Sequence, residues 1–276
     1  MGARPRIVIA GGGVGALEAL LALRSLLGSV PDIVLLAPQG EFSYMPLTVA
    51  APFSAGRERH FPLAEIARSL DADWTQDALL EVDGENRQVH TTSGLRLGYD
   101  ALILATGARR RPWLDGAITF RGAGDVEAIR ALLADLETSG IDRLVFAAPP
   151  GESWTLPLYE LALLTAGSMA EQGLSGVRLT IVTPETFPLA LFGPRAGDTV
   201  RRLLGDRGVR LITASYPVEF AGGALALAPA GSVPADQVIT LARCEGLGIA
   251  GLPHDAQGFI PTDRHARVEG VNHVYA

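Results

Sequence analysis

The sequence predicts an α/β protein of two related three-layer domains, each built on a parallel sheet, together with a β-meander. Three observations lead to this prediction. The chain opens with a strand, a glycine-rich turn, a helix and a second strand; helices and strands alternate again from about Asp125; and short strands separated by turn residues fill 74–97. Strands that alternate with helices are typical of parallel sheets covered by helices. A chain of 276 residues is long enough for two such domains.

The first strand–helix–strand unit stands at the start of the chain. Arg6–Ala10 is rich in Val and Ile, as expected of a strand that is buried on both faces. Leucines at helical spacing over Ala16–Leu27 predict a helix, which Gly28 can end. Ile33–Leu36 is the second predicted strand. We therefore expect these strands at the centre of a doubly wound sheet.

The later elements follow from the same patterns. Asp83-Gly84 and Ser93-Gly94 are hairpin signals and predict the β-meander. We expect a first domain over 1–110, completed by about 247–276, and a second over 111–246, which repeats the order of the first. The other predicted elements are a connection (Gln39–Pro62), helices (Leu63–Leu70, Val126–Glu137, Tyr159–Ala170, Thr199–Leu204), strands (Ala101–Ala105, Leu144–Ala148, Leu179–Thr183, Val209–Ile212), a β excursion (Gly222–Ala230, Gln237–Leu241) and a final strand from about His273.

Composition and charge exclude several functional classes. The net charge is −7, and because the sequence contains no lysine, all 23 basic residues are arginines. An acidic chain whose only basic run is Arg109-Arg110-Arg111 is not expected to bind nucleic acid. The lack of lysine also excludes a Schiff-base mechanism. Cys244 is the only cysteine, so no internal disulfide can form.

The sequence shows no targeting or membrane-spanning segment. The N-terminus enters a strand almost at once and lacks the sections of a secretion signal. No run reaches the ~18 uninterrupted apolar residues that a membrane span requires. The histidines stand singly, without metal-ligand spacing, so we predict no metal site: His60, His90, His254, His265 and His273. We expect a cytoplasmic protein.

The turn after the first strand carries a dinucleotide-binding pattern. Gly11-x-Gly13-x-x-Ala16 has the required strand before it and helix after it. Gly11 permits the tight turn, Gly13 lets the backbone approach a pyrophosphate, and Ala16 keeps helix and strand close. The helix N-terminus then presents free N–H groups to the negative charge. The alternative is a tight turn that binds no ligand. The predicted cofactor-binding residues here are Gly11, Gly12, Gly13, Val14, Gly15 and Ala16.

The end of the second strand departs from this pattern. A carboxylate usually stands there to bind the adenosine ribose. This strand instead ends Leu35-Leu36-Ala37-Pro38, and Glu41 lies four residues beyond Ala37.

Taken together, four features resemble the flavoproteins of the pyridine nucleotide–disulfide oxidoreductase family. They are the glycine loop, the β-meander, Tyr99–Gly107 with its Ala-Thr-Gly ending, and a late stretch over Leu252–Asp263 and Val274–Ala276. The sulfide:quinone oxidoreductases, flavocytochrome c sulfide dehydrogenases and type II NADH dehydrogenases are the most similar members. Phe42–Leu47 and Arg59–Leu63 also resemble segments of these proteins. Phe42–Leu47 could alternatively be only an apolar loop anchor.

The resemblance implies two Rossmann-like FAD/NAD(P)-binding domains and FAD as the cofactor. It implies that Thr106 and Gly107 pack against FAD and that Pro46 lies near the flavin. Glu160 matches the place of a glutamate that faces flavin and nicotinamide, where a carboxylate could relay protons. The alternative for Glu160 is a solvated helix residue.

The second domain departs from the family pattern. Where a nicotinamide-binding half repeats the glycine loop, this chain has Pro149-Pro150-Gly151-Glu152-Ser153-Trp154, whose prolines lack N–H donors. The next strand ends at Thr183 without an acid for the ribose. Both departures disfavour NAD(P)H binding. Members that oxidise sulfide use redox cysteines, and Cys244 alone cannot form their bridge; a packed, inert thiol is its other interpretation.

We therefore expect an FAD-dependent oxidoreductase that passes electrons from a small reductant to a quinone or another acceptor. The alternatives are an NAD(P)H-dependent flavin reductase with an altered nicotinamide site and a non-catalytic remnant of the fold. Relatives continue after Val274-Tyr275-Ala276 into a Gly-Asp pair whose aspartate binds the ribityl chain of FAD. The sequence thus suggests a truncated FAD domain with an incomplete flavin site, and a longer form could associate peripherally with a membrane.

Overall fold

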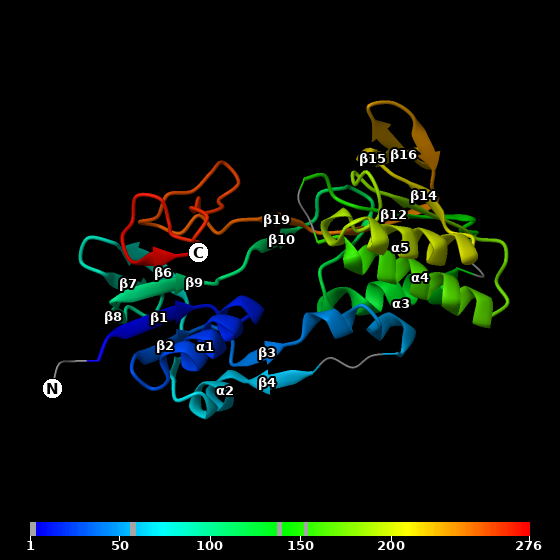
Figure 1. Ribbon diagram of the computed structural model, residues 1–276. Coiled ribbons are helices and arrows are strands. Elements are labelled where there is room, and N and C mark those ends of the chain that lie inside the picture. The colour runs from blue at the N-terminus through cyan, green and yellow to red at the C-terminus, as the bar shows by residue number, and fades with distance from the viewer. Residues whose placement is uncertain (1–3, 56–58, 137–139, 152–153) are drawn as a thin grey trace. The chain divides into compact units, whose positions relative to one another are not determined.

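The computed structural model describes residues 4–55, 59–136, 140–151 and 154–276 (Figure 1). The described residues divide into two compact units. The first unit contains 4–43, 59–109 and 245–276, and the second contains 44–55 and the described part of 110–244. The boundaries between the units fall at 43–44, 58–59, 109–110 and 244–245. β10 (Arg109–Arg111) and β19 (Arg243–Glu245) form a two-stranded ribbon.

The first unit is built on a five-stranded parallel sheet with the strand order β20-β9-β1-β2-β5. In β1 and β2 the pairing runs from Arg6–Asp32 to Ala10–Leu36, so the two strands end at the same edge. The strands are β1 (Arg6–Ala10), β2 (Asp32–Leu36), β5 (Asp73–Thr75), β9 (Ala101–Leu104) and β20 (Val274–Tyr275).

Helices and a meander cover the two faces of this sheet. Because side chains alternate along a strand, Ile7 and Ile9 pack against the helices while Val8 and Ala10 pack on the other side. The helical layer is α1 (Val14–Leu27) and α2 (Leu63–Ser69). The other layer is the antiparallel meander of β6 (Leu79–Asp83), β7 (Gln88–Thr91) and β8 (Arg96–Gly98). β3 (Glu41–Ser43) and β4 (His60–Pro62) pair antiparallel in a separate two-stranded sheet.

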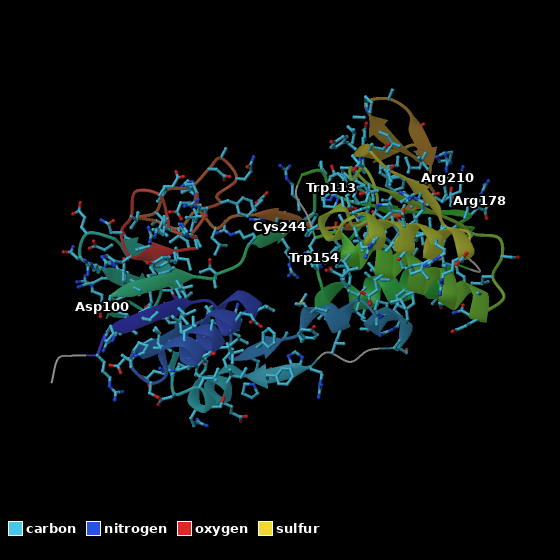
Figure 2. All side chains as sticks on the ribbon, viewed as in Figure 1. Asp100, Trp113, Trp154, Arg178, Arg210 and Cys244 are labelled. Atoms are coloured by element: carbon cyan, nitrogen blue, oxygen red, sulfur yellow. The ribbon has the colours of Figure 1, made fainter. Side chains whose placement is uncertain are left out.

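The second unit repeats this plan. Its five parallel strands have the order β11-β18-β12-β13-β14. Arg178 and Arg210 mark the amino ends of β13 and β14 (Figure 2). The strands are β11 (Ile118–Phe120), β12 (Arg143–Ala147), β13 (Arg178–Val182), β14 (Arg210–Ile212) and β18 (Gln237–Leu241).

The second sheet also lies between helices and a meander. Phe146 and Ile181 face the helices, whereas Val145 and Val182 face the meander. The helices are α3 (Val126–Asp135), α4 (Leu156–Glu171) and α5 (Pro194–Asp206), with short 3-10 turns η1 (Met45–Thr48), η2 (Ala51–Phe53), η3 (Ala123–Asp125) and η4 (Ala190–Phe192). The meander is β15 (Tyr216–Ala221), β16 (Ala224–Ala228) and β17 (Ser232–Pro234) (Figure 1).

The α/β fold class and the repeated plan are confirmed, and three local expectations are corrected. The strand at Trp74 belongs to the parallel sheet, where it pairs with Leu35, and is not part of the meander. The predicted helix at Tyr159 begins earlier, at Leu156, because Pro157 suits a first helical turn. The predicted helix at Thr199 begins at Pro194 for the same reason. Glu137, the predicted end of α3, lies outside the described residues.

No helix in the described part of the chain combines the length and the apolar character that crossing a bilayer requires.

Candidate functional site

The glycine loop lies against the end of β9. Gly11 has φ of +140°, and a Cβ on it would stand 2.1 Å from the carbonyl oxygen of Ala105, so only glycine fits there. The N–H of Gly11 also donates to the carbonyl of Leu36 at 2.8 Å. Thr106 and Gly107 directly follow Ala105. The structure thus brings together two groups of predicted cofactor-binding residues that are far apart in the sequence.

The other loop glycines differ in what surrounds them. A Cβ on Gly12 would meet the Leu63 side chain at 2.7 Å and the Cβ of Ala37 at 3.0 Å. A Cβ on Gly13 would meet nothing within 4 Å. Ala16 is completely buried, as expected of a residue that lets α1 pack closely on the sheet. Gly12 is therefore a packing position, and Gly13 borders open space.

The N-terminus of α1 is left uncapped. Gly13 is the N-cap residue, no side chain caps the helix, and its first turn contains no acidic residue. Helix geometry leaves the N–H groups of Val14, Gly15 and Ala16 without intrahelical acceptors, at the positive end of the helix dipole. Val14 is 56% exposed, so ligands can reach this end. Open space beside donors that lack acceptors fits the diphosphate of FAD.

Thr106 and Gly107 also border a hollow of about 190 Å³ in the first unit. The sequence did not predict its other wall, which Gly246, Gly248 and Gly258 build. A Cβ on Gly246 would stand 2.0 Å from the backbone of Gly258, and the Gly248 N–H donates to the Gly258 carbonyl at 3.1 Å. The Gly258-Phe259-Ile260 stretch, noted in the sequence as part of the resemblance, was the available signal.

The carboxylate missing from the end of β2 is not supplied by Glu41. Ala37 is completely buried at this strand end. Glu41 lies on β3, where its Oε2 is 3.4 Å from Nδ1 of His60 on β4. The Ser43 hydroxyl also lies 3.0 Å from this nitrogen. Glu41 therefore lies next to His60 of the paired strand.

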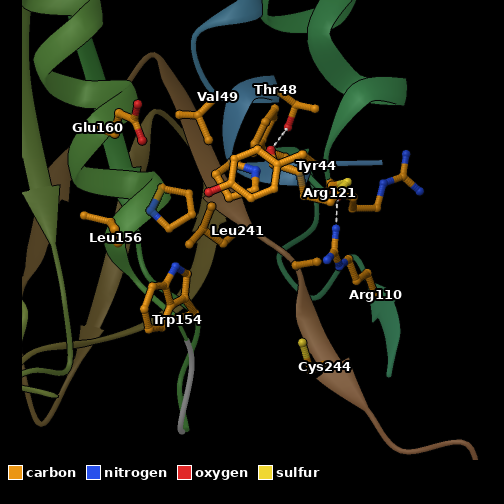
Figure 3. Close-up of a pocket in the computed structure, with 15 residues that line it drawn as sticks. Tyr44, Thr48, Val49, Arg110, Arg121, Trp154, Leu156, Glu160, Leu241 and Cys244 are labelled. Atoms are coloured by element: carbon orange, nitrogen blue, oxygen red, sulfur yellow. Dashed lines mark hydrogen bonds between the residues drawn. The ribbon is translucent and has the colours of Figure 1, made fainter. Parts of the chain in front are cut away.

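Pro46 and Glu160 line one pocket of the second unit (Figure 3), which has a volume of about 440 Å³. Its wall is largely apolar. The sequence predicted only Pro46 and Glu160 of this wall, because its residues come from five separate segments of the chain. Tyr44 and Trp154 are 43% and 55% exposed, while Val49, Phe120 and Leu241 are buried. The other lining residues are Met45, Thr48, Arg110, Arg121, Leu156, Pro157, Ala242 and Cys244.

Glu160 is the carboxylate of this pocket. It projects from α4 at one side, with Arg110 and Cys244 at the other (Figure 3). Partial burial raises the pKa of the Glu160 carboxyl above its ordinary value, because desolvation disfavours the charged form. Its side chain makes no hydrogen bond or ion pair with the described residues. Such a carboxyl can exchange a proton with a bound molecule.

The two arginines of the pocket are held differently. Asp125, which is 8% exposed, accepts from Nη2 of Arg121 at 2.6 Å and from the Arg121 backbone N–H at 2.7 Å. These hydrogen bonds raise the pKa of Arg121. Nη1 of Arg110 donates to the Arg121 carbonyl. The Asp125 carboxylate neutralises Arg121, so Arg110 supplies the less compensated positive charge.

The crossover after β12 lacks a nucleotide cradle in its described part. Pro149 and Pro150 follow β12, while Glu152 and Ser153 lie outside the described residues. An acid does follow β13, but Glu185 is already engaged. Its Oε2 accepts from the Tyr159 hydroxyl at 2.7 Å and from the Thr183 hydroxyl at 3.1 Å, and its Oε1 accepts from the Ala190 N–H at 3.1 Å.

The described residues offer neither a metal-ligand cluster nor a disulfide. Within the described ranges, no three His, Cys, Asp or Glu side chains gather in a way that could hold a metal ion. Cys244 is exposed on β19 and is a free thiol.

Comparison with known proteins identifies the family. A family model of pyridine nucleotide-disulphide oxidoreductases matches residues 5–145. The sulfide-quinone reductase of Aquifex aeolicus (strain VF5) is 28% identical over 219 residues, which cover 72% of this chain and 47% of that protein. The ferredoxin–NAD(+) reductase component of the biphenyl dioxygenase system of Paraburkholderia xenovorans (strain LB400) is 30% identical over 278 aligned positions, covering 91% and 64%. The chain thus spans about half to two thirds of these relatives.

Solved structures share the fold. The sulfide:quinone oxidoreductase of Aquifex aeolicus superposes with a TM-score of 0.83 at 21% identity, covering 98% of this chain and 67% of that one. NDH2 from Plasmodium falciparum gives a TM-score of 0.74 at 16% identity, covering 99% and 64%. The family match confirms the resemblance seen in the sequence. The chain belongs to the pyridine nucleotide-disulphide oxidoreductase family, whose members are FAD-dependent oxidoreductases.

Proposed function

We propose that this protein passes electrons from a small reductant through FAD to a quinone or another acceptor. The observation that carries the proposal is the glycine loop of the first unit. Open space at Gly13 lies beside the N–H groups of Val14, Gly15 and Ala16, which have no intrahelical acceptors. These groups would hold the diphosphate, with Gly11, Gly12, Thr106 and Gly107 completing the cradle. When bound, FAD supplies the electron-transfer chemistry.

The largely apolar pocket of the second unit favours an apolar electron acceptor, such as a quinone. Its wall of Tyr44, Pro46, Phe120 and Leu241 suits a planar ring, and among its described lining residues Glu160 is the one carboxylate. Reduction of a quinone consumes protons as well as electrons. With its raised pKa, Glu160 would keep a proton at a higher pH than an ordinary glutamate and could deliver it to a ring in this pocket. We also assign Pro46 and Glu160 to the border of the isoalloxazine, as the resemblance implies.

Two features weigh against NAD(P)H as the electron donor. Pro149 and Pro150 offer no N–H groups to a diphosphate, and the carboxylate of Glu185 already accepts three hydrogen bonds. An NAD(P)H-dependent reductase remains the second candidate because similar proteins are named ferredoxin–NAD(+) reductases.

The test has two stages. Flavin-free protein is titrated with FAD while the flavin absorbance is followed, and the complex is then mixed anaerobically with sulfide or with NADH. We expect saturable binding of one FAD per chain and bleaching by a small inorganic reductant before NADH. Rapid bleaching by NADH alone would favour the second candidate. A folded protein that binds no flavin would contradict both and favour a non-catalytic member of the family.

A further inference from the structure

The glycine loop of the first unit has an unassigned polar neighbour at the end of β2. The side-chain oxygen of Gln39 lies 3.5 Å from the point where a Cβ on Gly12 would stand. Gln39 follows β2 by three residues and is exposed. Its amide makes no hydrogen bond with the residues that the structure describes. It therefore stands at the loop with both its donor and its acceptor available.

The backbone that carries Gln39 is held on each side. The N–H of Ala37 donates to the Thr75 carbonyl at 3.1 Å, and the carbonyl of Gly40 accepts from the Leu63 N–H at 2.9 Å. Pro38 restricts its own φ, and its carbonyl accepts a long hydrogen bond of 3.4 Å from Gln76. These contacts keep the Gln39 backbone at the loop, which reduces the backbone entropy that would be lost on binding a ligand.

The carboxylates that follow β2 and β5 already have partners. Glu41 pairs with His60 across β3 and β4. Asp77, which follows β5, accepts from the hydroxyls of Thr92 and Ser93 and from the Ala78 N–H, and these bonds lower the pKa of its carboxyl. Each of these carboxylates therefore has a neighbouring partner, whereas the Gln39 amide makes no hydrogen bond with the described residues.

We infer that Gln39 binds the adenosine ribose of the dinucleotide through a neutral amide, in place of the usual carboxylate. The inference rests on the proposed function, because it needs the diphosphate to lie at the glycine loop. A carboxylate at this position accepts from ribose hydroxyls and repels a phosphate on the 2′ oxygen. An amide can donate or accept and carries no charge. The site therefore takes adenosine diphosphates with a free or a phosphorylated 2′ oxygen.

The experiment measures competition for the FAD site. Flavin-free protein receives FAD, and ADP-ribose or 2′-phospho-ADP-ribose is added as competitor while flavin anisotropy is recorded. In the wild type, we expect the two competitors to differ by less than about threefold. Gln39→Glu should weaken the 2′-phosphorylated competitor by roughly tenfold relative to ADP-ribose, because a carboxylate then faces a phosphate at close range. Gln39→Ala should weaken both by roughly 3- to 10-fold through one lost hydrogen bond.

A matched control separates local from overall charge. Gln257→Glu adds the same charge on an exposed side chain of the same unit and should leave the ratio of the two competitors unchanged. An unchanged ratio in Gln39→Glu, with FAD binding intact, would overturn the inference alone. Failure of the wild type to bind FAD would overturn the proposed function, and the inference with it.

Discussion

Replacing two glycines of the same loop separates folding from cofactor binding. In Gly11→Ala, the new Cβ stands 2.1 Å from the backbone oxygen of Ala105, which cannot rotate away, and φ of +140° is strained for alanine. We expect the backbone strain to lower the free energy of unfolding by about 1–3 kcal/mol. The overlap with the Ala105 oxygen should lower it by about 1–3 kcal/mol more. At about 2–4 °C per kcal/mol, the melting temperature should fall by roughly 4 °C or more.

Gly13→Ala is the matched partner of this variant. Gly13 has φ of −94°, which alanine adopts, and a Cβ there meets nothing within 4 Å. Loss of glycine at an N-cap should cost no more than about 1 kcal/mol. The methyl group, however, would stand where the diphosphate approaches the backbone, so the FAD dissociation constant should rise at least about tenfold.

The assay pairs a thermal melt followed by circular dichroism with an FAD titration of each variant. If Gly13→Ala kept both its stability and its FAD affinity within about twofold, the diphosphate would not lie at this loop. If Gly11→Ala melted at the wild-type temperature, the assigned contact with Ala105 would be wrong.

Three further predictions concern ionisable groups. At pH values well above 4.5, Glu160→Gln should raise the free energy of unfolding, because burial raises the pKa of Glu160 and makes its ionised form unfavourable in the folded state. Below pH 4.5 this gain should vanish. Denaturant melts on both sides of pH 4.5 measure the difference. Tyr159→Phe removes the hydroxyl that Glu185 accepts from and should cost about 1.5–3 kcal/mol in urea unfolding, whereas Tyr216→Phe, at a residue 48% exposed, should cost almost nothing. Asp77→Asn should lower the free energy of unfolding at neutral pH, because hydrogen bonds from Ser93 and its neighbours lower the pKa of Asp77. In melts at pH values below 3.8, the difference in unfolding free energy between this variant and the wild type should shrink.

Much of the fold was predictable because its patterns are local. The Val- and Ile-rich run at Arg6–Ala10 and the glycines after it indicate a buried parallel strand and a turn into a helix. The same alternation, repeated after Asp125, predicts the second sheet. A three-residue strand such as Asp73–Thr75 has too little periodicity to reveal whether it pairs in parallel or antiparallel, so its place came only from the structure.

The candidate sites were predictable where a backbone requirement shows in the sequence. Gly11 and Thr106 stand out because glycine loops and strand ends are sequence features. The pocket of the second unit was not predictable in full, since segments distant in sequence build it: residues 44–49 pack with that unit although they follow a strand of the first. The strand that ends at Thr183 carries no acid at its end, and the acid that follows, Glu185, is not free to bind a ribose. Its carboxylate already accepts hydrogen bonds from the hydroxyls of Tyr159 and Thr183.

The most direct test of the central claim compares FAD with FMN, which lacks the adenosine half. Flavin-free wild-type protein is titrated with each flavin under the same conditions. If the glycine loop of the first unit holds the diphosphate that joins flavin to adenosine, FAD should bind at least about 100-fold more tightly than FMN. Equal affinity for the two flavins would place the binding energy elsewhere and contradict the assignment of this loop.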